Sequence, residues 1–156
     1  MAITNIPTAR DIMTKRVHTI PAESDVDAAI RMLLKHGHSG APVVDSDGAP
    51  QGILSEHDCI RVLVRAIADR WLAGRAAEHM TSELETVSPT DDVLSLATRF
   101  AEGKHRRLLV MEEGRLVGLI SRHDLLRALE SLEKRAAGAR QPTTYEVLEE
   151  RHRDLD

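Results

Sequence analysis

Hydrophobic and polar positions follow the same succession of patterns in both halves of the chain. A brief helix, a short strand and an amphipathic helix are followed by a two-stranded hairpin and a second amphipathic helix. In the first half we expect these elements at 9–13, at 17–20, from a cap at Ser24 to Gly37, at 40–45 with 51–54, and from 58 to Gly74. In the second half, after a similar start at 78–81, we expect them at 84–87, at 91–101, at 107–112 with 115–120, and from 124 to near Gly138.

A seven-residue motif joins each hairpin to the helix that follows it. The motif reads GILSEHD at 52–58 and GLISRHD at 118–124, an offset of 118 − 52 = 66 residues. The segments 11–14 and 78–81 correspond at an offset of 78 − 11 = 67, so the second hairpin turn is one residue shorter, a change that turns tolerate well. Two copies of this length favour a pair of similar domains over a solenoid array.

The motif has a purely structural explanation, the capping box. A serine at a strand-to-helix junction, with an acidic residue three positions later, satisfies free backbone donors at the start of the helix. Ser55 and Ser121 are the predicted N-caps, and Asp58 and Asp124 stand at the third helical position. Close packing is an equally structural reason for Gly118. The repetition of the whole motif favours a function in addition to the cap.

Taken together, these features resemble a tandem pair of CBS domains, also called a Bateman module. The resemblance rests on an apolar-Met-Thr start, a Thr-Ile/Val strand near proline, the strand Ala41–Asp45 and the repeated motif, and it covers about 7–130. It implies an α/β (α+β) fold of two tandem β-α-β-β-α domains packed about a pseudo-twofold axis, whose clefts usually hold adenosine-containing ligands. We expect CBS domain 1 at 7–66, a connecting helix end and linker at 67–76, CBS domain 2 at 77–133, and a tail with a short helix at 134–156.

The chemistry of an adenosine nucleotide assigns roles to the motif of the second copy. The two acceptor oxygens of Asp124 match two adjacent ribose hydroxyls, and a helix N-terminus offers N–H groups to phosphates. Ser121 can turn its hydroxyl toward either group. Arg106 and Arg107 stand just before the middle strand, where nucleotide-binding members of the family often carry basic residues. Strand alternation lets only one of them point into the cleft, and a solvated strand edge is the alternative explanation.

The two clefts are expected to differ, because Ser39 and Gly40 replace the two arginines in the first copy. The first cleft is therefore expected to be weaker, empty or suited to a less charged adenosine compound. The adenine ring is expected against Ile20 or Val87 and the start of the neighbouring middle strand, although apolar packing also explains those residues. The complete set of candidate ligand-binding residues is Ser121, Asp124, Arg106, Arg107, Val87, Gly118, Ser55, Asp58, Ile20 and Pro42.

Composition narrows the possible classes of protein. Hydrophobic residues make up 42% and charged residues 29%, as in a soluble globular protein. A net charge of −4 and only three aromatic residues argue against a nucleic-acid partner. The single Cys59 excludes an internal disulfide, no apolar run reaches the roughly 20 residues of a membrane span, and the N-terminus is unlike a signal peptide. We expect a cytoplasmic protein with no membrane partner.

Eight histidines raise the alternative of a metal-responsive sensor. His36 and His38 are two residues apart, and His57 and His123 are equivalent positions that a pseudo-twofold axis could bring together. However, the chain has no Cys-x-x-Cys or His-x-x-x-His pair, and no catalytic motif. We expect a stand-alone regulatory module, not an enzyme, that senses AMP, ADP, ATP or S-adenosylmethionine as a regulatory ligand and requires no cofactor.

Two surfaces predict protein partners. The helices after both motifs carry more apolar surface than one small unit needs, which favours a homodimer. The apolar stripe of the first of these helices ends with Trp71. After Pro142, Thr143 and Glu146 form a capping-box signature for a final helix. Its apolar face is expected to dock on the closing helix of the second copy, on a dimer mate or on a regulated partner. A structural interaction subunit with vestigial clefts is therefore the remaining alternative.

Overall fold

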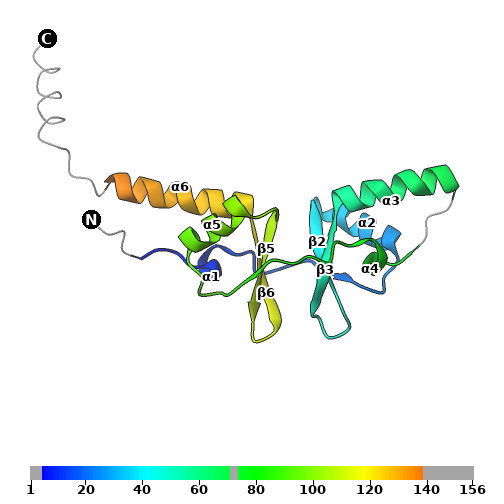
Figure 1. Cartoon of the computed structure of the whole chain (residues 1–156), viewed down its shortest axis with the longest axis horizontal. Helices are drawn as coiled ribbons and strands as arrows, with labels where there is room; N and C mark the ends of the chain where they lie inside the picture. The colour runs from blue at the N-terminus through cyan, green and yellow to red at the C-terminus, as the bar shows by residue number, and fades with distance from the viewer. Residues whose placement is uncertain (1–4, 71–73, 139–156) are drawn as a thin grey trace, which may run out of the picture.

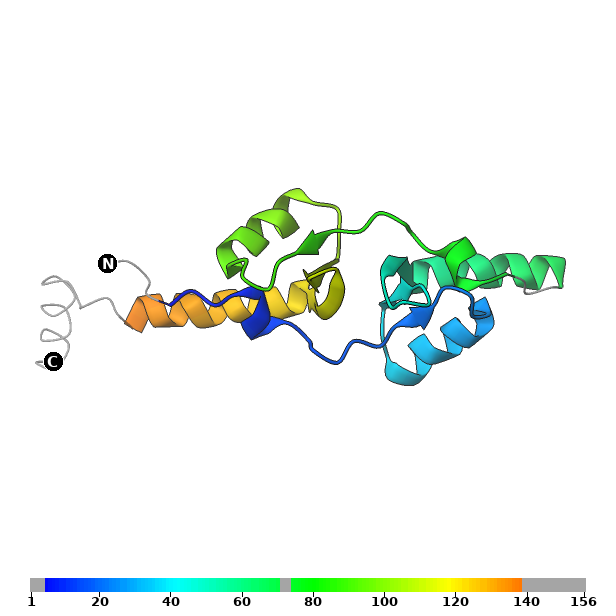
Figure 2. The same cartoon turned by 90° about the horizontal axis from the view of Figure 1, so that it is seen from below.

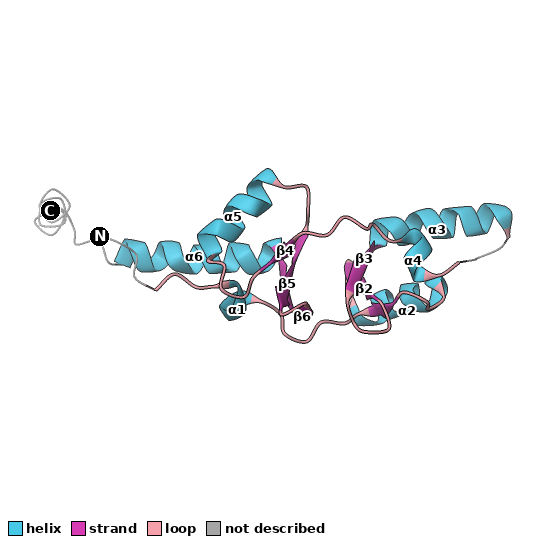
Figure 3. Ribbon diagram, turned by 60° about the horizontal axis from the view of Figure 1, so that its bottom comes forward, coloured by secondary structure: helices cyan, strands magenta, loops and turns pink. Residues whose placement is uncertain are grey.

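The computed structural model describes residues 5–70 and 74–138. It contains two similar lobes that lie side by side, each with its own three-stranded sheet (Figure 1). The strands occupy the centre of the molecule and the helices lie outside them (Figure 3). The elements in chain order are α1 (Ala9–Ile12), β1 (Ile20–Pro21), α2 (Val26–His36), β2 (Gly40–Val44), β3 (Pro50–Ser55), α3 (Glu56–Asp69), α4 (Ala76–His79), β4 (Thr86–Val87), α5 (Val93–Glu102), β5 (Arg107–Glu112), β6 (Arg115–Ser121) and α6 (Arg122–Gly138).

Both sheets have the same topology. The first strand pairs in parallel with the second, and the second pairs antiparallel with the third. Each antiparallel pair has an irregularity at the corresponding place, between Val43 and Val44 and between Val110 and Met111. The expected class, a mixed α+β fold made of two tandem copies of one unit, is confirmed.

The hairpin turns explain the one-residue difference between the copies. Glu113 and Gly114 both have positive φ, 48° and 76°, and they alone connect the paired residues Glu112 and Arg115. A two-residue turn of this kind matches the twist of the strands that it joins. The turn of the first copy is longer and uses Gly48 at φ 81°. Turn length therefore changes between the copies without changing the sheets.

Several predicted ends of elements need correction. Asp25, not Ser24, is the N-cap of α2, because the Ser24 hydroxyl instead donates to the Pro21 carbonyl at 2.6 Å. The helix α3 ends at Asp69, where Arg70 adopts the left-handed conformation at φ 55°, rather than continuing to Gly74. The strands β1 and β4 are only two residues long, because only two of their residues pair with the neighbouring strand. Gly37 does end α2 in the left-handed region, as predicted.

The two lobes exchange the segments that precede them in the sequence. The helix α1 packs in the second lobe, where Ala9 is fully buried and its N–H donates to the Asp91 carbonyl at 2.8 Å. The helix α4 packs in the first lobe, where Ala76 is fully buried and donates to Ser24 at 2.9 Å. Figure 2 shows α1 (blue) beside α6 before the chain crosses to the first lobe. The linear domain boundaries stay a prediction, while the packing units interleave along the sequence.

Short backbone bridges and two glycines fasten each exchanged segment. Thr14 and Leu119 exchange two hydrogen bonds at 2.9 and 3.0 Å, and Ile53 and Thr81 do the same at 2.9 Å each. A Cβ atom on Gly118 would lie 2.3 Å from Met13 Sδ, and one on Gly52 would lie 2.6 Å from Met80 Sδ. The glycines therefore let a methionine of the exchanged segment lie directly on the strand. The structure thus provides a packing reason for Gly118.

Some predicted features lie outside the described residues. These are Trp71 at the end of the apolar stripe, and the helix and docking surface expected within 139–156. The start of the expected tail, 134–138, continues α6. Among the described helices, none combines the length and the apolar composition that a membrane span needs.

Candidate functional site

Each repeated motif lines a cleft that residues from both copies complete. The Asp124 cleft has a volume of about 510 Å³ and the Asp58 cleft one of about 580 Å³, both within the range of small-molecule sites. The Asp124 cleft is lined by Thr14, Arg16, Val17, His18, Gly37, His38, Ser39, Gly40, Pro42, Arg106, Arg107, Leu119, Ser121, Arg122, His123 and Asp124. The Asp58 cleft is lined by Ser39, Ile53, Ser55, Glu56, His57, Asp58, Ile60, Thr81, Glu83, Lys104, His105, Arg106 and Arg107.

The predicted capping boxes form in both motifs. Ser121 donates to Asp124 Oδ2 through its backbone N–H and its hydroxyl, each at 2.8 Å, and the Asp124 N–H returns a bond of 3.2 Å to the hydroxyl. Ser55 and Asp58 repeat the arrangement at 2.9, 2.6 and 3.3 Å. These bonds to the carboxylates all use Oδ2. The cap therefore holds each carboxylate in the wall of its cleft and leaves Oδ1 outside the cap.

Arg107 bridges the two lobes at the point where the clefts meet. Its guanidinium donates to the Ser39 hydroxyl, and a Cβ on Gly40 would lie 2.8 Å from its Nη1. Burial lowers the pKa of Arg107, and the charge of Arg106 lowers it further, against an opposing effect of Glu56. Among the described residues, no carboxylate forms an ion pair with this half-buried cation. A bound anion would therefore replace lost hydration and supply the missing counter-charge.

Arg106 and Arg107 line both clefts, because the start of β5 lies between the two clefts. Arg106 is exposed and Arg107 is half-buried. Strand alternation thus does not select one arginine for a single cleft. Contact with phosphate stays a prediction for each of them.

The remaining predicted residues divide between the clefts and the cores. Pro42 comes from the first copy but lines the Asp124 cleft beside the motif of the second copy. Ile20 and Val87 are 1% and 5% exposed and belong to the two hydrophobic cores, not to the walls of the clefts. Contact between these two residues and an adenine ring stays a prediction. The apolar wall that the Asp124 cleft does offer consists of Val17, Pro42 and Leu119.

Sequence reasoning missed the contribution of the crossing segment 14–18. Thr14, Arg16, Val17 and His18 all line the Asp124 cleft. They do so because Thr14 bridges to Leu119 of β6 and so draws the segment along the second motif. The correspondence of Thr14 with Thr81 was the available signal, since Thr81 lines the Asp58 cleft. Each cleft therefore combines one motif with the crossing segment that bridges to its third strand.

The two clefts differ in their balance of charge. Four arginines line the Asp124 cleft, and Asp124 is the one carboxylate in its lining. In the Asp58 cleft, Lys104, Arg106 and Arg107 are balanced by Glu56, Asp58 and Glu83. The whole chain has a net charge of −4, so the Asp124 cleft is a local exception. Its electrostatic field favours an anionic ligand.

A comparison of the sequence with known families agrees with this architecture. The profile of the CBS domain matches residues 9–65 and 76–131. The chain belongs to the CBS-domain family. Its two matched segments form a tandem pair of CBS domains.

Three relatives illustrate the similarity. The protein MJ1225 of Methanocaldococcus jannaschii is 30% identical over 131 residues, which are 84% of this chain and 45% of that protein. The chain thus spans less than half the length of that relative. The crystal structure of CBSX2 in complex with AMP, a protein of Arabidopsis thaliana, has a TM-score of 0.70 at 25% identity and covers 81% of this chain and 98% of that one. The CBS domain of a CBS domain-containing membrane protein from Sphaerobacter thermophilus has a TM-score of 0.67 at 30% identity and covers 79% and 88%.

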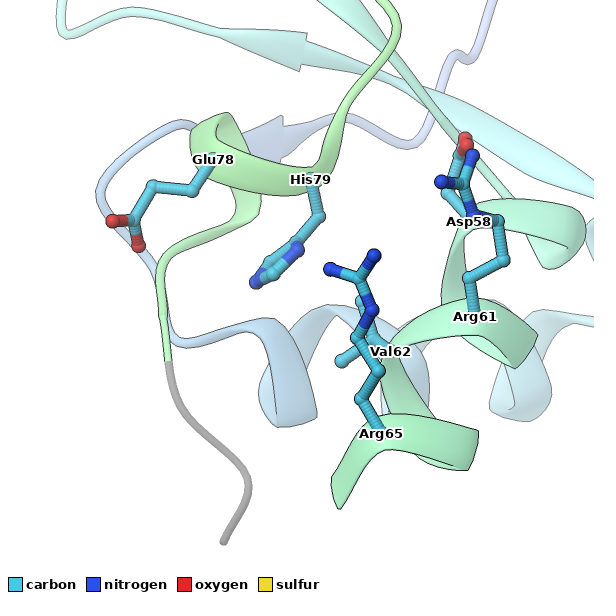
Figure 4. Close-up of a pocket in the computed structure, with 6 residues that line it drawn as sticks. All are labelled: Asp58, Arg61, Val62, Arg65, Glu78 and His79. Atoms are coloured by element: carbon cyan, nitrogen blue, oxygen red, sulfur yellow. The ribbon is translucent and has the colours of Figure 1, made fainter. Parts of the chain in front are cut away.

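A third cavity lies in the first CBS lobe and shares Asp58 with the Asp58 cleft. Its volume is about 160 Å³, and α3 and α4 form its walls. Figure 4 shows Arg65 of α3 extending toward His79 of α4, with Glu78 turned outward. The other lining residues are Asp58, Arg61 and Val62. A polar space of this size is below the range of nucleotide sites.

The two histidines that a pseudo-twofold axis could have brought together line different clefts. His57 lines the Asp58 cleft, whereas His123 lines the Asp124 cleft and bonds to Arg127 Nη2 at 3.0 Å. Within 5–70 and 74–138, no group of three or more histidine, cysteine, aspartate or glutamate side chains is arranged to hold a metal ion. The structure therefore gives the metal-sensor alternative no site in these residues.

Proposed function

We propose that this CBS pair is a regulatory module that binds an adenosine nucleotide, with the Asp124 cleft as its principal site. One observation carries the proposal: the Ser121–Asp124 cap and the half-buried Arg107 line the same cavity of about 510 Å³. A carboxylate suited to ribose hydroxyls and cations suited to phosphates thus face one volume. The complex of the related CBSX2 with AMP supports the same class of ligand.

Each part of the ligand has a matching part of the cleft. Asp124 Oδ1 would accept from the ribose hydroxyls, while the cap keeps Oδ2 in place. The phosphates would lie toward Arg106 and Arg107, away from the repulsion of the carboxylate. The adenine ring would lie against the apolar residues Val17, Pro42 and Leu119. Because the Asp58 cleft has balanced charges, it would bind a less anionic adenosine compound, such as S-adenosylmethionine, or none.

A second part of the proposal is self-association through α3. Ile60, Val64 and Ile67 are 60%, 61% and 79% exposed and share one face of this helix. An apolar stripe of this kind is typical of a helix that another surface covers. In Figure 1, α3 and α6 lie along the same edge of the molecule, so a second copy could contact both. We propose that this edge forms a homodimer.

The ligand proposal is tested by calorimetric titration of the purified protein with AMP, ADP, ATP, S-adenosylmethionine and adenosine. We expect AMP, ADP or ATP to bind at one site per chain more tightly than adenosine does. GTP serves as the control for charge without an adenine base. Failure of every adenosine compound to bind would leave the structural interaction subunit as the better explanation. Equal binding of GTP would show a phosphate site without recognition of the base.

A further inference from the structure

Three histidines of the first copy cluster beside the Asp124 cleft. The rings of His18 and His36 stack with centroids 4.0 Å apart, and the ring of His38 lies 4.9 Å from His18 and 5.7 Å from His36. His18 Nδ1 and His38 Nε2 are 2.7 Å apart, a hydrogen bond in which one ring donates and the other accepts. His18 and His38 line the cleft, and His36 stacks on His18. The function proposed above assigns no role to this cluster.

The surroundings of the cluster are strongly cationic. Lys35 precedes His36 on α2, while Arg16 and His18 lie on the crossing segment and line the cleft. Across the cleft are Arg106 just before β5, Arg107 at its start, and Arg122, His123 and Asp124 at the start of α6. Desolvation lowers the pKa of His36, and the charges of His18, Lys35 and His38 lower it further. Without an anion nearby, the ring of His36 therefore resists taking up a proton.

Neighbouring positions in the chain place the histidine pair close to Arg107. His38 is followed by Ser39, whose hydroxyl accepts from the guanidinium of Arg107. The histidine pair and Arg107 thus lie at the same end of the cleft wall. A protonated imidazole has two N–H donors and no acceptor, so a doubly protonated pair would lose the bond between His18 and His38. Phosphate oxygens can accept from both rings and replace that bond.

We propose that His18 and His38, with His36 stacked beside them, form a proton-linked subsite for the terminal phosphate of the nucleotide in the Asp124 cleft. The inference rests on the nucleotide function proposed above and adds a coupling to pH. Binding of the phosphate raises the proton affinity of the rings, so the nucleotide and the proton bind together. By linkage, affinity for the nucleotide rises as the pH falls.

The test compares wild-type protein with the double variant His18→Gln/His38→Gln, using ADP and ATP titrations between pH 8.0 and 6.0. Both histidines lie at the surface of the cleft, not in a core, so the variant should fold. Uptake of one proton changes affinity by up to about tenfold per pH unit. We expect ADP and ATP affinity to rise by at least about threefold more in the wild type than in the variant over this range. Titration in buffers of different ionisation enthalpy should show more proton uptake in the wild type than in the variant.

Two controls isolate the cluster. The terminal phosphate itself titrates near pH 6, but it does so equally for both proteins and cancels in the comparison. Adenosine has no phosphate, so its affinity should show no difference in pH dependence between the two proteins. His79→Gln removes a histidine that lines the small third cavity and not the Asp124 cleft, and it should retain the wild-type pH dependence.

The outcomes separate this inference from the function on which it rests. Nucleotide binding with the same pH dependence and the same proton uptake in wild type and double variant would overturn the histidine subsite alone. Absence of nucleotide binding at every pH would overturn both the subsite and the proposed function. EDTA in all solutions ensures that any effect of the histidines does not come from a bound metal ion.

Discussion

Asp58 and Asp124 form the same cap in the two copies, yet they face clefts of different charge. Each accepts from the backbone N–H and the hydroxyl of the serine three residues before it. Around Asp124 the other charged lining residues are arginines, whereas Glu56 and Glu83 accompany Asp58. The two copies therefore share the capping box, whereas the charges around the carboxylate, on which the proposed ligand binding depends, differ. This pairing offers an internal control for mutations.

Asp124→Ala should weaken nucleotide binding, while Asp58→Ala should not weaken the principal site. Loss of a charge-assisted hydrogen bond costs about 1.5–3 kcal/mol, which is roughly tenfold to hundredfold in affinity. Loss of the cap should lower stability by about 1 kcal/mol in either variant. Calorimetry measures the affinity, and urea denaturation measures the stability. An equal loss of affinity in both variants would show that the cap, rather than a ribose contact, controls binding.

Replacement of Arg106 and Arg107 by alanine should discriminate between ligands by their charge. Since charge-assisted bonds to phosphate are lost, ATP and ADP affinity should fall at least about tenfold. Adenosine affinity should change by less than about twofold, because it makes no such bond. Lys104→Ala removes a nearby charge that lines only the Asp58 cleft, and it is the matched control for the general electrostatic field. A parallel loss for adenosine and ATP would exclude a direct phosphate contact.

At the scale of elements, the sequence pattern predicted those features that depend only on residues close together in the chain. The apolar spacing of α2, the left-handed Gly37 and both capping boxes depend on residues within four positions of one another. The exchange of α1 and α4 does not, because Ala9 bonds to Asp91 and Ala76 bonds to Ser24. Ala9 and Ala76 are small residues in two separate four-residue helices, and neither helix carries a local sign of such a partner. For the same reason the crossing segment 14–18 was missed as a wall of the site.

The face of α3 offers a test at this scale. Val64→Glu with Ile67→Glu places two charges on side chains that are 61% and 79% exposed. In a monomer such a change affects stability little, whereas in a dimer it buries unpaired charge. We expect the variant to be monomeric in light scattering at a concentration at which the wild type is a dimer. Leu94→Glu, on the 46% exposed Leu94 of α5, is the control. A wild type that remains monomeric over the whole concentration range would refute the proposed interface.

At the scale of the whole molecule, the exchanged segments should make the two lobes unfold together. Gly118→Ala places a methyl group 2.3 Å from Met13 Sδ and should push the crossing segment away from β6. Overpacking of this kind costs about 1–3 kcal/mol. We expect a lower melting temperature and one unfolding transition shared by both lobes. Differential scanning calorimetry measures both.

A second change identifies the cause. Met13→Ala in the Gly118→Ala background should recover part of the lost stability, because the clashing side chain is gone. Gly48→Ala alters a glycine whose Cβ would meet nothing within 4 Å, so it reports the cost of positive φ alone. Two separate transitions in the wild type would show that the exchange does not couple the lobes.

Because of the crossing segment 14–18, the affinity of a ligand in the Asp124 cleft should depend on the spacing of the two lobes. It connects α1, which packs in the second lobe, with β1 of the first, and on the way it lines the Asp124 cleft. A ligand that contacts this segment, Pro42 and Asp124 at once binds tightly at one spacing of the lobes only. A partner protein that binds the lobes at that spacing raises the affinity for the ligand. The ligand raises the affinity for the partner protein by the same factor. A partner that binds the lobes at a wider spacing must lower the affinity of the ligand. Ligand and partner could then each influence the binding of the other through this one connection between the lobes.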